Sequence, residues 1–494
     1  MQGTINKRTG LLIGMMIMLV SLGKAQSNLV FYHTKNQVQS SYLNPANLSF
    51  QEKFTFSIFP IAGTSIGINN ADIIQEVYHS LKEGTDPDED LKNAFNSIIK
   101  GDLFYERIDN ILLNFGFNSD IGSFSFHIKE NAQLLSNFKG EFSEFLMSPT
   151  FQSVVINEPQ SFPVEALHYR EYSLGYAKEI IRNKLSVGLR AKLYYGKSSL
   201  FSEVEGKVIR ENTNYYLQTS GAMRLSAPVD DVLKDGLLLK LNLSKDFTVG
   251  NYLMNSKNPG IGFDLGFNYK ITPDLVFSAS VIDLGKIKWK NSQNTMLFDS
   301  KYQFSKRSVT ESIDENGLPI LIKNYEDISL SDSISKLFEI KIDNSIYSKA
   351  LPATFYAGLN YRIMPKLTIG VVDRYIMSTR LNHNSFSITA NYDVSKKLSV
   401  STGYSIIGNL YNNIPLAFLY TWNSGQSYIG TDNFVSILYP SGSEFAGITF
   451  GTCFFLFRNT KKYKKQNEYL PYFKEKRAKS RTSKGLIFNN YPES

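Results

Sequence analysis

The residue types that most often carry chemistry are few and scattered in this sequence. The five histidines lie far apart, without the His-x-His or His-Glu-x-x-His spacing that would place two of them on one metal ion. They are His33, His79, His127, His168 and His383. Cys453 is the only cysteine, so the sequence predicts no zinc or iron–sulfur cluster and no internal disulfide. We therefore expect neither an enzyme nor a cofactor.

A second set of polar residues has a spacing that indicates a water-filled interior. Arg190 and Lys192 alternate with apolar residues and so share one face of an extended segment with small side chains. Such a face must be wet, which suits the lumen of a barrel and not the core of a sandwich. Asp264 and Asp283 flank one hairpin and are expected to pair with bases such as Arg190 or Arg374. Further candidates for lumen-facing polar residues are Asn268, Asn360 and Arg362.

The stretch 260–285 sets the pattern on which these assignments depend. Ile261, Phe263 and alternate residues after them are large and apolar, whereas the residues between them are small or polar. The chain turns at 272–274 and the alternation resumes, which predicts an antiparallel hairpin. Three glycines on the small face are predicted to face the lumen where backbone or the plug packs closely, and not to form a dinucleotide-binding loop: Gly260, Gly262 and Gly266.

The same alternation recurs along most of the chain and predicts an all-β fold. Tight polar turns fall near residues 119, 182, 273, 365, 396 and 424, and they alternate with connections that are mostly longer. Outer-membrane barrels have short periplasmic turns and longer external loops. We therefore predict a transmembrane antiparallel β-barrel of about 14 strands, with about 16 as the alternative, and both termini in the periplasm.

The domain organisation follows from composition. Residues 1–25 have the basic, apolar and small-residue regions of a secretory signal peptide, and residues 26–50 are polar and irregular. The barrel is expected over 51–457, with a helical loop at 70–107 and long loops at 131–166, 226–258 and 291–350. Residues 458–494 form a basic tail, with eleven Lys and Arg against two Glu up to Lys484. The net charge of +8 therefore describes this tail and does not predict nucleic-acid binding.

Asn44-Pro45-Ala46, just before the first predicted strand, resembles the asparagine-proline-alanine signature of the outer-membrane long-chain fatty-acid transporter superfamily (FadL/TodX-like). The resemblance implies a fourteen-stranded barrel into which the N-terminal segment folds as a hatch. Residues 26–50 would be that hatch, with Asn44, Pro45 and Ala46 as its fixed point. Within the superfamily, residues 262–266, 281–289 and 430–433 resemble the branch that includes the PorV-type barrels of type IX secretion. The nearest resemblance in that branch is to an uncharacterised set of such barrels.

Two functions are consistent with these features. The first is a hatch-plugged channel of the bacterial outer membrane that binds or passes hydrophobic small molecules. The alternative is a non-transporting barrel that serves as an anchor or shuttle for secretion or gliding machinery. The expected partners are outer-membrane lipid, a hydrophobic small-molecule ligand, and a secretion-machinery or periplasmic protein that binds the loops or the basic tail.

Overall fold

The computed structural model describes 15 ranges of the chain, and the account below is confined to them. They are residues 29–34, 37–50, 53–69, 104–136, 155–211, 214–230, 242–244, 246–291, 293–304, 311–313, 319–321, 341–378, 382–408, 410–438 and 445–456. The predicted signal peptide, most of the predicted helical loop at 70–107 and the basic tail lie outside the described residues.

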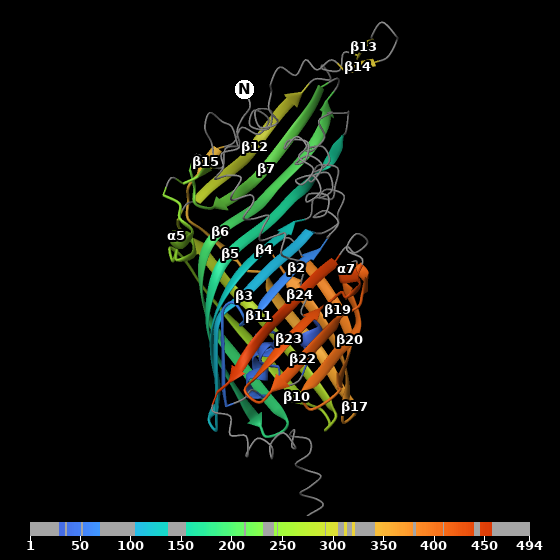
Figure 1. Ribbon diagram of the computed structural model, residues 1–494. Coiled ribbons are helices and arrows are strands. Elements are labelled where there is room, and N and C mark those ends of the chain that lie inside the picture. The colour runs from blue at the N-terminus through green and yellow to red at the C-terminus, as the bar shows by residue number, and fades with distance from the viewer. Residues whose placement is uncertain are drawn as a thin grey trace, which may run out of the picture.

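One closed antiparallel β-barrel forms the wall of the molecule (Figure 1). In chain order the wall strands are β1 (Phe54–Ile58), β2 (Thr64–Asn69), β3 (Phe104–Ser119), β4 (Gly122–Ser136), β5 (Ile156–Ile181), β6 (Leu185–Glu211), β10 (Asn258–Lys270), β11 (Leu275–Trp289), β16 (Tyr347–Ala350), β17 (Ala353–Met364), β18 (Leu367–Met377), β19 (Asn382–Asp393), β20 (Leu398–Ile407), β21 (Leu410–Asn413), β22 (Leu416–Trp422), β23 (Gly425–Thr431) and β24 (Phe445–Phe455). Three pairs of strands, β1 with β2, β16 with β17 and β21 with β22, each share one position in the wall. The wall therefore has 14 positions, as predicted.

The first and last strands close the barrel, because β24 pairs with both β1 and β2. The six predicted tight turns all join neighbouring strands of the wall, as hairpins β3–β4, β5–β6, β10–β11, β17–β18, β19–β20 and β22–β23. The first wall strand, β1, begins at this short-turn end, and the last wall strand, β24, ends there. There the N–H of Asn118 donates to the carbonyl of Lys53, and the N–H of Phe455 donates to the carbonyl of Ser424.

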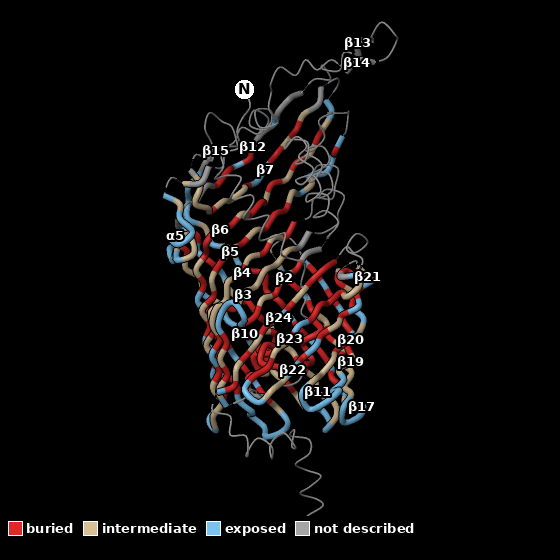
Figure 2. Tube along the Cα trace, viewed as in Figure 1, coloured by how far each residue is buried: buried red, intermediate tan, exposed pale blue. Residues whose placement is uncertain are grey.

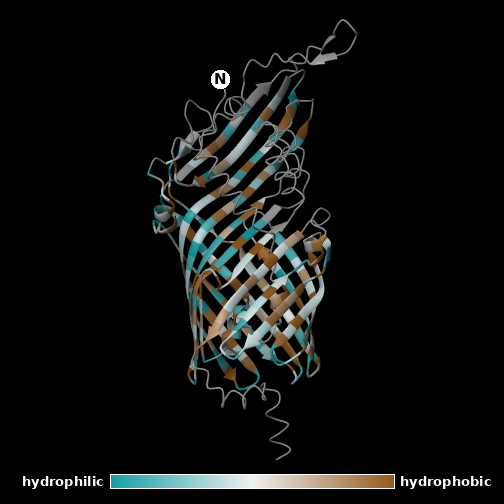
Figure 3. Ribbon diagram, in the orientation of Figure 1, coloured by the Kyte–Doolittle hydropathy of each residue, from teal (hydrophilic) through white to brown (hydrophobic). Residues whose placement is uncertain are grey.

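The two faces of the wall have opposite polarity, as the alternation predicts. Leu174, Leu193 and Ile261 point outward and are 65%, 54% and 62% exposed, whereas Ser173 and Lys192 between such residues are buried. Figure 2 shows this alternation of buried and exposed positions along the strands, and Figure 3 shows the apolar residues of the barrel wall. A closed barrel with an apolar exterior and a polar interior is suited to a bilayer, because its outer face can contact lipid while its inner face contacts water or protein. The fold is therefore of the outer-membrane type.

A curved sheet continues from one side of the barrel beyond the ends of its other strands (Figure 1). The upper half of β6 leaves β10 and pairs with β7 (Asn214–Ser226), which pairs with β12 (Gln293–Phe304), and β12 pairs with β15 (Lys341–Asp343). The remaining elements are small: β8 (Val229–Asp230), β9 (Asn242–Leu243), α5 (Val249–Leu253), β13 (Glu311–Ile313), β14 (Pro319–Leu321) and α7 (Val435–Leu438).

This extension corrects the predicted loops. Residues 131–136 and 156–166, expected within a loop, belong to β4 and β5, and the expected loop at 291–350 contains β12 to β16. The expected loop at 226–258 holds β8, β9 and α5, and β3 begins at Phe104, inside the expected loop at 70–107. The physical reason is that a sheet outside lipid can carry polar residues on both faces. Its strands therefore lose the alternation by which the wall strands are recognised.

Residues 29–34 and 37–50, called here the lumenal segment, lie inside the barrel (Figures 1 and 2). They form three short 3-10 turns, η1 (Leu29–Phe31), η2 (Val38–Tyr42) and η3 (Pro45–Phe50). Leu29 and Tyr32 pack with Tyr356 and Val372 of the wall, so apolar side chains of the segment are buried against the lumen. Among the described residues, no helix is long and apolar enough to cross a membrane.

Candidate functional site in the barrel lumen

The Asn44-Pro45-Ala46 tripeptide lies against strand β10 inside the barrel. The side-chain amide of Asn44 donates to the carbonyl of Phe267 and to Oδ1 of Asn268, each at 3.3 Å. Its own Oδ1 accepts from the N–H of Ala46 at 3.0 Å. Pro45 and Ala46 are themselves buried. Asparagine therefore fixes the local turn and joins the lumenal segment to the wall.

Glycines in the wall make room for this tripeptide. A Cβ atom at Gly188 would lie 2.3 Å from the carbonyl carbon of Pro45, and one at Gly266 would lie 2.2 Å from Oδ1 of Asn44. Real Cβ atoms do not approach other atoms so closely, so the segment lies directly on these two positions, with its backbone at Gly188 and with the side chains of Asn44 and Pro45 at Gly266. The predicted role of Gly266 is therefore observed, whereas a Cβ at Gly262 would meet the ring of Tyr194.

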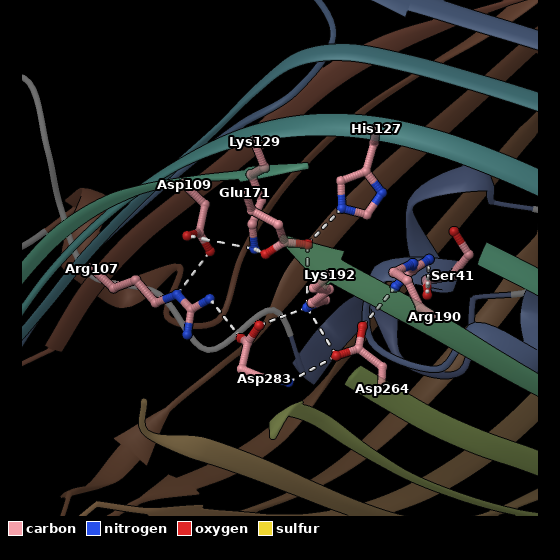
Figure 4. Close-up of polar contacts among 10 residues, drawn as sticks. All are labelled: Ser41, Arg107, Asp109, His127, Lys129, Glu171, Arg190, Lys192, Asp264 and Asp283. Atoms are coloured by element: carbon pink, nitrogen blue, oxygen red, sulfur yellow. Dashed lines mark hydrogen bonds and ion pairs between the residues drawn. The ribbon is translucent and has the colours of Figure 1, made fainter. Parts of the chain in front are cut away.

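Arg190 connects the segment to a group of buried charges on the lumen wall (Figure 4). One guanidinium nitrogen donates to the backbone carbonyl of Ser41 at 3.1 Å, and another lies 3.1 Å from Asp264. Arg190 and Asp264 face each other directly in the register of β6 and β10, as the predicted pairing requires. An arginine can bridge two acceptors in this way because its donors lie in a fixed planar fork.

Lys192 lies two residues after Arg190 on β6 and is surrounded by carboxylates. Its Nζ lies 2.6 Å from Asp283, 2.9 Å from Asp264 and 3.2 Å from Glu171. All four side chains are buried, and each of the carboxylates has Lys192 as an ion-pair partner. A buried charge of this kind is tolerated only when it is paired, so the side chains depend on one another.

The group continues across strands β3, β4 and β5 (Figure 4). His127 Nε2 lies 2.8 Å from Glu171, Arg107 lies 2.8 Å from Asp109 and 3.5 Å from Asp283, and Lys129 lies within 4.0 Å of Asp109 and Glu171. We call the set Arg107, Asp109, His127, Lys129, Glu171, Arg190, Lys192, Asp264 and Asp283 the lumen charge cluster. Apart from His127 it contains four bases and four acids, so its formal charges cancel.

A β-bulge places the last acid of the cluster. The register between β10 and β11 shifts between Phe263 and Leu265, and Asp283 adopts a φ of 62°. Aspartate tolerates this left-handed conformation better than most residues. The N–H of Asp283 donates to Oδ1 of Asp264 at 2.8 Å, and its side chain points into the lumen towards Lys192. The bulge therefore brings two acids to one base.

The other predicted lumen residues lie in three different places. Asn268 is buried beside the segment and donates to Oδ1 of Asn47 at 2.9 Å. Asn360 and Arg374 are buried on β17 and β18, in the opposite wall, where Arg374 donates to Oγ of Ser385 at 2.9 Å. Arg362 lies at the short-turn end, where its Nε donates to Asp274 at 2.8 Å. Of the two bases predicted as partners of Asp264, Arg190 forms the ion pair in the structure.

The sequence analysis missed five members of the cluster: Arg107, Asp109, His127, Lys129 and Glu171. Arg107 and Asp109 fall at alternate positions of one strand, and so do His127 and Lys129. This alternation could have identified them as lumen-facing. The outward residues beside them include Glu130 and Arg170, which form an ion pair, so the apolar half of the pattern is missing there.

One short string in the sequence matches a hydrolase motif. Gly63-Thr64-Ser65-Ile66-Gly67 has the Gly-x-Ser-x-Gly spacing of a nucleophile elbow, in which the serine sits on a sharp turn between strand and helix. Ser65 lies instead inside β2, and its Oγ is 2.9 Å from Oγ1 of Thr449 on β24. The string is therefore a piece of barrel wall. Among the described residues no group of three or more His, Cys, Asp or Glu could hold a metal ion.

A cavity lies between the lumenal segment and three members of the lumen charge cluster, Arg107, Asp109 and Lys129. Its volume is about 80 Å³, and it is partly open to solvent. Apolar and aromatic side chains line much of it, from the segment and from both walls: Phe31, Leu43, Ile111, Ile282, Tyr356, Ile376 and Tyr428. Polar side chains line the rest; the charged ones are Arg107, Asp109, Lys129 and Arg374. The cavity is therefore amphipathic.

Comparison with known proteins places the chain in a family. Residues 45–432 match the model of a family of unknown function, DUF5723, and the chain belongs to that family. A search among curated proteins finds no match.

Solved structures with a similar fold include outer-membrane channels. The Ralstonia pickettii toluene transporter TbuX is 9% identical (TM-score 0.38; 84% of this chain and 92% of that one covered). The P. putida toluene transporter TodX is 12% identical (TM-score 0.34; 83% and 90% covered), and a Pseudomonas aeruginosa FadL homologue is 11% identical (TM-score 0.34; 85% and 93% covered). The resemblance to the PorV-type branch stays a prediction.

Proposed function

We propose that this protein is an outer-membrane channel for hydrophobic small molecules whose lumen is closed by the lumenal segment. The observation that carries the proposal is the position of this segment, which is buried across the barrel and forms one side of the cavity. A molecule that enters the cavity meets Phe31 and Leu43 of the segment before it can go further. Passage therefore requires the segment to shift, and residues 29–50 act as a hatch.

The lining of the cavity supports a hydrophobic or amphipathic ligand. Ligand sites are mostly apolar and contain a few placed polar groups, and this cavity combines aromatic side chains with Arg107, Lys129 and Arg374. An apolar body would contact Tyr356 and Tyr428, and a polar end would reach one of the bases. Asn44-Pro45-Ala46 resembles the signature of a superfamily that transports long-chain fatty acids. A fatty acid has such an apolar body and a polar, anionic end.

The attachment of the segment to the wall suits a movable part. In the described residues of the segment, no strand pairing ties it to the barrel. Hydrogen bonds that involve side chains do so, at Asn44, at the carbonyls of Ser41 and Leu43, and at the N–H of Val30 and of Val38. A segment that is not paired into a sheet can open without breaking the strand ladders around it. The segment can therefore be displaced while the barrel stays closed.

We further propose the orientation of the barrel. Short turns face the periplasm in barrels of this type, so the end with the six tight turns is assigned to the periplasm. The lumenal segment meets the wall near that end, since Asn44 contacts Phe267 and Asn268, only a few residues before the β10–β11 turn. In this orientation the cavity faces the outside of the cell and the segment separates it from the periplasm.

A reversible lock on the segment tests the proposal. A Cβ atom at Gly370 would lie 3.1 Å from Cβ of His33, slightly below the usual 3.5–4.5 Å range of a disulfide. The variant His33→Cys/Gly370→Cys, made in a Cys453→Ser background, should form a bond that holds the segment on β18. Uptake of radiolabelled fatty acid or hydrocarbon by cells that depend on this variant should be lost under oxidising conditions and return with reductant.

The two single-cysteine variants in the same background are the matched controls, and oxidation should leave their uptake unchanged. Equal uptake by the oxidised and the reduced double variant would contradict a hatch. Absence of protein-dependent uptake in every variant, including the unsubstituted chain, would contradict the channel itself. The alternative role as a secretion or gliding anchor stays a prediction.

A further inference from the structure

Three lysines form a ladder on the outer surface of β11, well away from the lumen. Lys286, Lys288 and Lys290 are exposed, whereas Ile287 and Trp289 between them are fully buried on the inner face. Alternate residues of a strand share one face and are separated by about 7 Å, so the three ammonium groups lie in one row. We call Lys286, Lys288 and Lys290 the lysine ladder.

A fourth lysine lies beside the upper end of the ladder. Oδ1 of Asn258 accepts from the backbone N–H of Lys290 at 2.8 Å and from that of Asn291 at 3.0 Å, which holds the start of β10 against the end of β11. Lys257 precedes Asn258 and is exposed. The outer surface at this point therefore carries four bases on two adjacent chain segments.

The ladder begins where the apolar exterior of the barrel ends. Lys286 pairs with Ile261, which is 62% exposed, and one step towards the short turns Phe263 pairs with Leu284. At the other edge of the apolar belt Phe277 pairs with Tyr269, nine residues before Lys286. Nine residues span about 30 Å along a strand, or about 23 Å along the barrel axis at a tilt of about 40°. This height agrees with the apolar band of roughly 25 Å that such barrels present to lipid.

The lysines differ from the bases inside the barrel in having no acidic partner. Within the described part of the chain, no ion pair joins Lys257, Lys286, Lys288 or Lys290 to a carboxylate, whereas Arg190 and Lys192 are each paired with acids. Like charges in a row repel one another, and an anion bound beside them removes that repulsion. The position of the row at the edge of the belt selects an anion that belongs to the membrane.

We infer that the lysine ladder, with Lys257, binds the phosphate groups of a lipid in the membrane leaflet at the long-loop end. The acyl chains of that lipid would lie on Ile261, Phe263 and Leu284, while its phosphates contact the ammonium groups directly above them. The inference uses the proposed orientation of the barrel in the membrane. It does not depend on whether the barrel conducts a ligand.

Binding of lipid A to the purified protein in nanodiscs or detergent tests this inference. The variant Lys286→Gln/Lys288→Gln/Lys290→Gln removes three charges from the ladder, and Lys366→Gln/Lys396→Gln/Lys397→Gln removes three exposed charges from turns at the opposite end. Each lysine near an anionic surface contributes on the order of fivefold to affinity, so the ladder variant should bind diphosphoryl lipid A roughly a hundredfold more weakly. The turn variant should bind within about twofold of the unsubstituted chain.

Two further probes identify the source of the phosphate. Dephosphorylated lipid A should bind the unsubstituted protein as weakly as diphosphoryl lipid A binds the ladder variant, and inorganic phosphate alone should not saturate the site at millimolar concentration. Equal affinity of the ladder and turn variants, tight binding of the dephosphorylated lipid, or saturation by inorganic phosphate would each overturn the inference. Circular dichroism confirms that both variants are folded, and the disulfide-lock uptake assay tests the hatch separately.

Discussion

Strands β3–β6, β10 and β11 form one side of the barrel wall and strands β16 to β24 form the other, and the two sides contact different parts of the lumenal segment. The first side, here the charged wall, carries the lumen charge cluster and contacts η3 through β4, β5, β6 and β10. The second side, here the opposite wall, contacts η1 through β19, β20 and β22. The two walls therefore hold two ends of one segment.

The chemistry of the two contacts differs. On the charged wall the segment is held by directed hydrogen bonds, from Arg190 to the carbonyl of Ser41 and from Asn44 to β10. On the opposite wall Val30 and Phe31 pack against Ala417, Leu419 and Tyr428. Directed bonds occur there too: the N–H of Val30 donates to Oδ1 of Asp432 at 3.0 Å, and Nε2 of His33 lies 2.9 Å from the carbonyl oxygen of Val371. Directed hydrogen bonds therefore fix both ends of the segment. The charged wall differs in that Arg190, which donates to Ser41, belongs to a network of buried ion pairs.

The largest expected effect is on the charged wall. Lys192→Met keeps the length of the side chain but leaves Asp264, Asp283 and Glu171 without their shared cation. Breaking a buried ion pair by removing one partner costs about 3–5 kcal/mol, so the free energy of unfolding in urea should fall by about that amount. Lys396→Met, on the exposed β19–β20 turn, is the control and should be almost neutral. A loss for Lys192→Met no larger than that of the control would show that the cluster does not stabilise this wall.

The smallest expected effect is on the opposite wall. Ser387 and Ser405 are buried there with their hydroxyl oxygens 2.7 Å apart. Ser405→Ala should cost about 1 kcal/mol in the same urea titration, because one neutral hydrogen bond is lost. The double variant Ser387→Ala/Ser405→Ala should cost no more, since it removes both partners. A loss as large as that of Lys192→Met would remove the proposed distinction between the two walls.

Much of this comparison could be predicted from the sequence, for a physical reason. Where lipid meets one face of a strand, large apolar residues must alternate with small or polar ones, and the tight turns between such strands fix their order. Arg190 and Asp264 fall on the polar faces of two predicted hairpins, so the alternation predicts a lumenal position for both. The direct pairing of their strands, β6 and β10, is a finding of the structure. The 14 wall positions follow from the same pattern.

The rest depended on features that alternation does not encode. The bulge that turns Asp283 towards Lys192 interrupts the two-residue alternation locally, and the spacing of apolar residues does not predict where it occurs. Arg107 and Lys129 lie on strands whose outward-facing residues near them are partly polar. The alternation of apolar and polar residues is therefore weaker in that part of the wall. The extension formed by β7, β12 and β15 stands outside the barrel wall and therefore shows no lipid-facing period.

The central claim is that residues 29–50 close the barrel, and conductance in a planar bilayer tests it most directly. If the segment closes the lumen as proposed, the purified full chain should produce no steady ion current. A variant that lacks residues 29–48 and keeps the whole wall from Phe54 onward should open a stable, voltage-independent pore. Equal conductance of the two proteins, or a closed barrel after the deletion, would contradict the claim.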